Sequence, residues 1–241
     1  MEILQPNGFD SLNKSLGQLR PFKHQIDVLF KLDKFASRCT RQRGLQKRVV
    51  DRTATQDFGN LFTMLDLAMS GDTSVQRQLS GLQEEAAEIL ENFRNDWADI
   101  SKMYAGLQMI YTAHEIKLIR QTGPYSPALK DKIMQNTALL AKDIIELNAD
   151  IIPNPLFPEV STSFAFRLAL VWQFHHIEWI GDGSPKSRSK RKANDPIDNT
   201  IITMATYFDD FQTFDVDAAE RFYIAKHILQ GLRSSELQFF S

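Results

Sequence analysis

Acidic residues gather in the last third of the chain, between positions 194 and 217. Asp195 and Asp198 stand at a turn before an apolar segment that favours a helix, and Asp215 closes a short β-prone run, Phe211–Phe214. A helix followed by a strand can bring such carboxylates together, and converging carboxylates repel one another unless a cation lies between them. The stretch therefore predicts half of an acidic metal site. A plainer interpretation, in which Asp195 or Asp198 only caps a helix, stays open.

The chemistry of such a site would be that of a hard divalent cation. Carboxylates without neighbouring His or Cys favour Mg²⁺ or Mn²⁺, which can activate a water and stabilise an oxyanion during phosphodiester cleavage. A basic run just before the acids could hold the phosphate backbone of the substrate. That run consists of Lys186, Arg188, Lys190, Arg191 and Lys192.

Other kinds of reactive site have weaker support. The chain has no Gly-rich phosphate-binding loop and no Gly-x-Ser-x-Gly nucleophile motif. The single cysteine, Cys39, lies among arginines and is interpreted as structural. His175 and Glu178 lie three residues apart, in the reverse order of the Glu-x-x-His pairs of di-iron bundles and without a second copy. We interpret His175 and His176 as two half-buried imidazoles at a helix end.

Composition limits the class of protein. The chain has 241 residues, 43% of them hydrophobic, which is enough to bury a core. A net charge of −2 excludes a uniformly basic nucleic-acid binder. One cysteine excludes a disulfide framework and a Cys-rich zinc site, and no apolar window is long enough to span a membrane. These features predict a soluble, cytoplasmic protein.

Helical patterns dominate the elements that would position the acids. A turn at Ser70–Asp72 precedes a long amphipathic pattern that ends near Ile100. Ser126 and Pro127 begin a helix to about Leu147. The most apolar segment, residues 164–180, is predicted to be a central helix, and residues 218–232 a closing amphipathic helix. The three prolines between residues 153 and 158 predict an extended linker, which would separate two subdomains.

The sequence pattern of the C-terminal part resembles that of PIN-like nuclease domains. The elements that carry the resemblance are Asn194-Asp195 and Asp198, then Ala205-Thr206-Tyr207-Phe208-Asp209, then Thr213-Phe214-Asp215, and a following helix over 219–229. The resemblance implies an α/β fold of high helix content, an α/β/α sandwich around a small parallel sheet. It also implies Mg²⁺ or Mn²⁺ held by Asp195 or Asp198 and by Asp215, and cleavage of RNA.

The first half of such a site departs from the family pattern, in which an apolar strand ends in Asp. The nearest matches are Gln25-Ile26-Asp27 and the run Met109–Thr112, which leads to Glu115. We take Glu115 as the additional ligand. The expected organisation is a helical region over 1–105, followed by a PIN-like domain over 106–241.

The expected function is a metal-dependent nuclease, a hydrolase that acts on RNA. Two alternatives stay open: an inactive PIN-like module, and an all-helical module whose acids only cap helices. Either would bind RNA or a protein partner, and a second copy of the chain is a further candidate partner.

Overall fold

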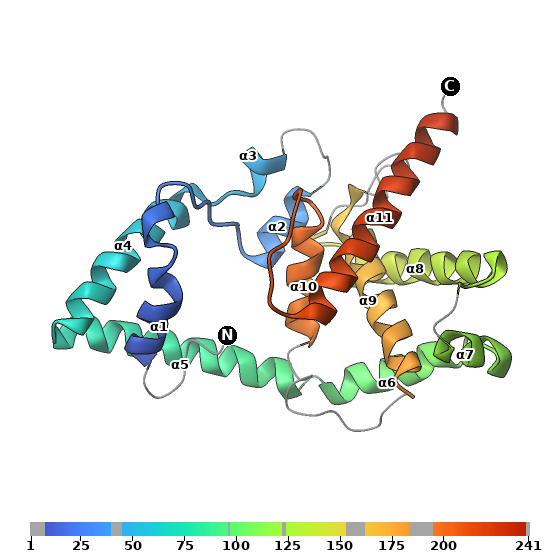
Figure 1. Cartoon of the computed structure of the whole chain (residues 1–241), viewed down its shortest axis with the longest axis horizontal. Helices are drawn as coiled ribbons and strands as arrows, with labels where there is room; N and C mark the ends of the chain where they lie inside the picture. Colours follow the sequence, from blue (N-terminus) through green and yellow to red (C-terminus); the bar gives the residue numbers. More distant parts are fainter. Residues whose placement is uncertain are drawn as a thin grey trace. The chain divides into compact units, whose positions relative to one another are not determined.

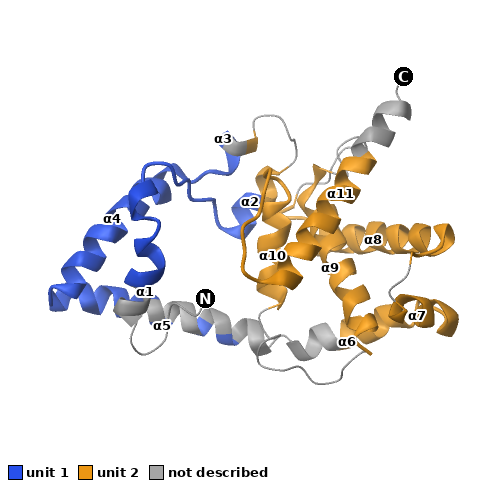
Figure 2. Ribbon diagram, in the orientation of Figure 1, with its two compact units in different colours: residues 1–35, 46–92 blue, residues 36–45, 93–241 orange. Residues whose placement is uncertain are grey.

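A computed structural model describes residues 8–39, 45–95, 97–121, 124–152, 162–183 and 195–239. The chain forms two compact units, shown in different colours in Figure 2. The first unit comprises residues 1–35 and 46–92, and the second comprises residues 36–45 and 93–241. The two units are described separately below.

The first unit is helical. Its elements are α1 (Gly8–Gly17), a short 3-10 helix η2 (Arg20–Phe22), the start of α2 (Leu32–Arg38), most of α3 (Leu45–Val49), α4 (Arg52–Met69) and most of α5 (Thr73–Asn95). Leu65, Ala68 and Leu79 form a small apolar core between α4 and α5. Asp72 begins α5, as the turn signal predicted, because its carboxylate accepts hydrogen bonds from the backbone N–H groups of Ser74 and Val75.

The second unit is organised around α9 (Phe164–Gly181), which contacts α7 (Ala113–Arg120), α8 (Pro127–Leu147), α10 (Asp195–Ala205) and α11 (Val216–Phe239). This unit also contains α6 (Trp97–Gln108) and the ends of α2 and α5. Figure 1 shows α10 and α11 lying beside α9. The prediction of a central helix is confirmed.

The sequence of α9 explains its central position. Thirteen of its 18 residues are buried, on every side of the helix, so it must be surrounded by other elements. Ser163 caps its first turn by accepting a hydrogen bond from the Phe166 N–H. Buried Arg167 donates to the carbonyl of Thr206 at 2.7 Å and lies over the ring of Tyr207, which ties the end of α10 to α9.

The helix α8 begins where the sequence indicates. Ser126 accepts a hydrogen bond from the Leu129 N–H, and Pro127 occupies the first turn, where its missing N–H costs nothing. Apolar side chains of α8, Leu129 and Ile133, pack with Ile177 and Ile180 of α9. This packing closes one side of the pocket described below.

The predicted α/β/α sandwich and its PIN-like fold are wrong. Across the described parts of the chain, strand pairing is limited to one antiparallel bridge between Leu29 and Val50. The β-prone run Phe211–Phe214 is a loop: Phe211 packs against Phe222 of α11, while the side chain of Phe214 is fully exposed. The apolar run at Met109–Tyr111 is the turn that follows α6. Neither run finds a neighbouring strand, and a strand without a partner leaves its backbone groups unpaired.

Candidate functional site

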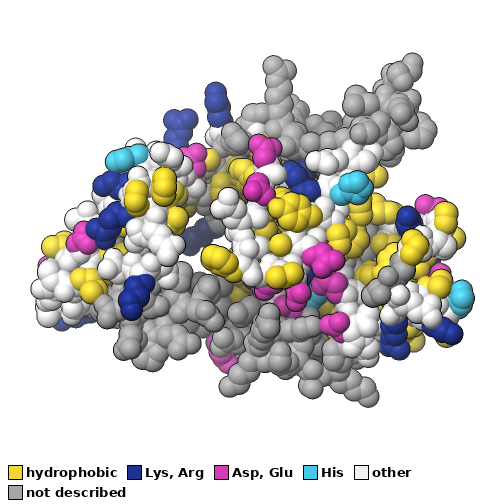
Figure 3. Space-filling model, viewed as in Figure 1, with side chains coloured by type: hydrophobic (Ala, Val, Ile, Leu, Met, Phe, Trp, Pro, Cys, Tyr) yellow, Lys and Arg dark blue, Asp and Glu magenta, His cyan; other side chains and the backbone are white. Residues whose placement is uncertain are grey.

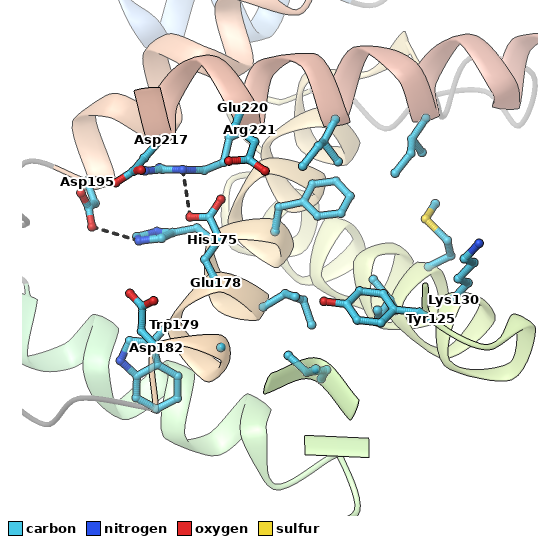
Figure 4. Close-up of a pocket in the computed structure, with 18 of the residues that line it drawn as sticks. Tyr125, Lys130, His175, Glu178, Trp179, Asp182, Asp195, Asp217, Glu220 and Arg221 are labelled. Atoms are coloured by element: carbon cyan, nitrogen blue, oxygen red, sulfur yellow. Dashed lines mark ion pairs between the residues drawn. The ribbon is translucent and has the colours of Figure 1, made fainter. Parts of the chain in front are cut away.

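A pocket of about 1010 Å³ lies in the second unit. The helices α7, α8, α9 and α11 form its walls, and Asp195 at the start of α10 reaches its edge. Figure 4 shows acidic side chains at one end and Tyr125 with Lys130 at the other. The volume is that of a site for a small molecule.

His175 connects the pocket to a buried polar network. Its Nε2 lies 2.9 Å from Oδ2 of Asp195, and the Asp195 side chain is 10% exposed. Its Nδ1 lies 2.8 Å from the hydroxyl of Tyr104 and 2.8 Å from Nδ2 of Asn199. Both ring nitrogens are therefore engaged, so His175 holds its neighbours in place and is not available as a free base.

Arg221 sets the orientation of this network. Its Nη1 donates to Oδ1 of Asn199 at 2.6 Å, which leaves the Asn199 amide nitrogen pointing to His175. Because that amide can only donate, Nδ1 of His175 must accept, and the ring proton lies on Nε2, where it is donated to Asp195. The buried guanidinium thus determines the tautomer of a histidine that it does not touch.

Glu178 lines the pocket and lies against Arg221. Its Oε2 lies 3.1 Å from Nε of Arg221, and 38% of its side chain is exposed. Burial raises the pKa of Glu178 to about 7, against the attraction of Arg221, and the charges of Asp217 and Glu220 raise it further. A carboxyl group that titrates near neutrality can hold or transfer a proton.

Of the three aspartates expected at a metal site, Asp195 and Asp198 lie in the first turn of α10 and Asp215 lies just before α11. Burial raises the pKa of Asp198, and the charges of Asp195 and Asp215 raise it further, so these carboxylates lie close enough to repel one another. Figure 3 shows a group of acidic side chains near the middle of the view. Asp215 also caps α11 by accepting a hydrogen bond from the Ala218 N–H.

Glu115 has a different environment. It forms a capping box with Thr112 at the start of α7, and its carboxylate is 2.8 Å from Nζ of Lys132. The hydrogen bonds from Lys132 and from the Thr112 backbone lower the pKa of Glu115 to about 2. Glu115 is not among the carboxylates whose charge acts on Asp198.

Metal ligation receives no geometric support within the described residues, where no group of three or more His, Cys, Asp or Glu side chains is arranged to hold an ion. The basic run Lys186–Lys192 lies outside the described residues. No helix in the described part of the chain is long and apolar enough to cross a membrane.

Sequence reasoning missed the residues that assemble the pocket. It noted His175 and Glu178 but interpreted the two histidines as half-buried, whereas His175 and His176 are fully buried. It did not identify Asn199 or Arg221. The spacing of Asp195 and Asn199, four residues apart on one helix, places both side chains on one face and was an available signal.

Comparison with models of known protein families, with curated proteins and with solved structures finds no match for this chain.

Proposed function

We propose that the pocket of the second unit binds a small organic cation that has an apolar body. The observation that carries this proposal is the charge of the pocket lining. Five acidic side chains line the pocket, Glu178, Asp182, Asp195, Asp217 and Glu220, against two basic ones, Lys130 and Arg221.

Among the described residues that line the pocket, acidic side chains outnumber basic ones. Arg221 is engaged by both Asn199 and Glu178, and the pKa of Glu178 is still raised to about 7. An ammonium or guanidinium group placed beside Glu178 would favour its charged form and relieve its repulsion with Asp217 and Glu220. A cation is therefore the ligand group that this end would recognise.

The apolar walls suit the remainder of such a ligand. Ile133 and Met134 of α8 and Phe174 of α9 line the pocket, together with Ile224, Ile228 and Leu232 of α11. Burial of ligand methylene groups against these side chains contributes about 0.8 kcal/mol for each group that is fully covered. Trp179 also lines the pocket and can attract a cation through its ring face.

Titration calorimetry of the full chain with hexylammonium, with 1-hexanol as the uncharged comparison, tests the proposal. Hexylammonium should bind and hexanol should bind more weakly. Glu178→Gln should weaken hexylammonium binding about ten-fold, because it removes a charge-assisted contact. Glu146→Gln is the matched control, since Glu146 lies exposed on α8 and does not line the pocket. Equal binding of the amine and the alcohol would overturn the proposal.

A second candidate function is divalent-cation-dependent cleavage of phosphodiesters, with RNA as the substrate. The raised pKa of Asp198 favours it, because burial and the charges of Asp195 and Asp215 disfavour the charged form of Asp198, and a nearby Mg²⁺ or Mn²⁺ would favour that form. The basic side chains of the run Lys186–Lys192 would then contact the phosphates of the RNA.

The test of this candidate is cleavage of RNA in the presence of Mn²⁺ by the native chain, Asp198→Asn and Asp215→Asn. Manganese-dependent cleavage that both variants lose would support the candidate. Absence of cleavage, or equal activity in all three proteins, would exclude it.

A further inference from the structure

Glu178 differs in its surroundings from the other acidic side chains of the pocket. Asp195 is buried and lies 2.9 Å from His175. The remaining acidic residues are exposed to solvent, namely Asp182, Asp217 and Glu220. Glu178 is half-buried, with 38% of its side chain exposed, and it lines the pocket. Its carboxyl group is therefore partly shielded from water and still open to a bound molecule.

Arg221 positions the Glu178 carboxyl group without holding it in the charged form. Nε of Arg221 lies 3.1 Å from Oε2 of Glu178, and Figure 4 marks this ion pair with a dashed line. The Nε–H group makes no hydrogen bond within the described parts of the chain, so the contact is an ion pair alone. The guanidinium is 4% exposed and donates from Nη1 to Asn199, which fixes its place. Burial outweighs its attraction and raises the pKa of Glu178 to about 7, so both forms of the carboxyl group are populated at neutral pH.

The described lining of the pocket offers few other reactive groups. None of the lining residues is Ser, Thr or Cys, so acyl transfer through a hydroxyl or a thiol has no candidate there. Both ring nitrogens of His175 are engaged by neighbouring side chains. Glu178 is thus the described group of this pocket that is arranged to take a proton from a bound molecule.

The neighbours of Glu178 favour proton uptake and an apolar substrate. The charges of Asp217 and Glu220 disfavour the charged form of Glu178, so accepting a proton relieves their repulsion. Phe174 lies four residues before Glu178 on α9, so both side chains lie on one face of the helix, and both line the pocket. An apolar substrate packed against Phe174 would lie within one helical turn of the carboxyl group.

We propose that this pocket is an active site in which Glu178 is the general base that removes a proton from a carbon acid. The substrate class is a neutral molecule with an apolar body and a C–H bond next to an electron-withdrawing group. This inference does not rest on the proposed binding of a cation, although it places the reaction in the same pocket.

Turnover of 5-nitrobenzisoxazole by the full chain tests the activity, because this flat, apolar carbon acid reacts in one step. A carboxylate takes the proton from the isoxazole ring, the electron pair of that C–H bond completes a nitrile, and the N–O bond breaks to leave a coloured phenolate. The carboxyl group then releases the proton to water. The native chain should show saturation, and kcat/KM should rise with pH through about 7 and level off, because only the charged carboxylate is a base.

Variants assign the activity to one side chain. Glu178→Gln should lower kcat/KM about 100-fold, because an amide cannot take up the proton. Glu178→Asp keeps a carboxylate and should retain a slower, pH-dependent reaction. Glu146→Gln is the matched control and should leave the rate unchanged, since Glu146 lies exposed on α8 outside the pocket.

The pH profile needs the same assignment, because other charged groups surround Glu178. Those of α9, α10 and α11 that line the pocket are His175, Asp182, Asp195, Asp217, Glu220 and Arg221. The rise with pH should disappear in Glu178→Gln if Glu178 is the base. Thermal melts check that each variant folds, and the profile of the native chain tests the inference independently of any variant.

The outcomes separate this inference from the proposed function. If hexylammonium binds but the native chain does not turn over the probe, or does so no faster than Glu178→Gln, the general-base inference alone is overturned. A native rate that is constant across neutral pH would overturn it as well. If turnover depends on Glu178 and no amine binds, the inference holds and the proposed function fails.

Discussion

The amide nitrogen of Asn199 lies 2.8 Å from Nδ1 of His175, on the side of the ring opposite the contact between Nε2 and Asp195. Arg221 holds the other end of the same amide at 2.6 Å. All of these side chains are buried. A chain of hydrogen bonds therefore joins α11 to α9 through α10, with one orientation of the amide and one tautomer of the histidine.

Asn199→Ala should destabilise the protein by about 1–3 kcal/mol, because it leaves a buried guanidinium donor without its acceptor. Chemical denaturation measures the loss. Ile201→Ala, an exposed position on the same helix, is the control and should change stability by no more than about 0.5 kcal/mol.

In the native protein, long-range ¹H–¹⁵N spectra should show His175 protonated on Nε2 alone. A proton on Nδ1 would contradict the proposed orientation of Asn199.

Binding of an alkylammonium ion should become tighter as pH rises through about 7. The pKa of Glu178 is raised to about 7, so its carboxyl group is neutral in mildly acidic solution and charged above neutrality. Only the charged form attracts the cation, so affinity should increase about ten-fold between pH 6 and pH 8 and then level off. Calorimetry across this range gives the profile.

Glu178→Gln should flatten that profile, whereas Glu220→Gln should keep its rise. If the profile rises equally in Glu178→Gln, the titrating group is a different one.

His176 should make the fold less stable in acid. Burial lowers the pKa of His176 to about 4 from a value of 6.5, so the unfolded chain takes up a proton more readily than the folded chain does. The contribution of neutral His176 is therefore fully present above pH 6.5 and is lost as pH falls toward 4, by about 3 kcal/mol in all.

Urea denaturation of the native chain and of His176→Gln measures this contribution as the difference between their stability curves. The difference removes the opposite contribution of Glu178, whose raised pKa favours the folded state below neutrality. Glutamine is chosen because its amide can still donate to the Tyr104 carbonyl, which lies 3.1 Å from His176 Nε2. Parallel curves for the two proteins would show that His176 does not titrate in this way.

The parts of the fold that the sequence predicted correctly are those with strong local signals. Ser126 and Pro127 predict the start of α8, and the continuous apolar run over residues 164–180 predicts the central helix. The capping pattern Thr112-x-x-Glu115 was equally local, but Glu115 was interpreted as a metal ligand. In the structure this carboxylate completes a helix cap and forms an ion pair with Lys132.

The error at Phe211–Phe214 has a physical cause. Phe and Thr favour strands only where a neighbouring strand completes their hydrogen bonds, and no such neighbour is present in the described residues. The sequence could not predict the residues that form the pocket, for a related reason. Asn199, Arg221 and Glu178 come from three helices, and their contacts depend on how the helices pack, which periodicity within one helix does not encode.

The exposed Phe214 has a consequence for the integrity of the chain. It stands in the loop between α10 and α11 with its side chain fully in solvent, where chymotrypsin can reach it. Limited proteolysis should therefore cut after Phe214, and Phe214→Ser should remove that cut. Phe222, Ala225 and Leu229 would still bury α11 against the core, so the two fragments should co-elute until denaturant separates them. The seven pocket-lining residues of α11 would then lie on a different fragment from the rest of the pocket lining.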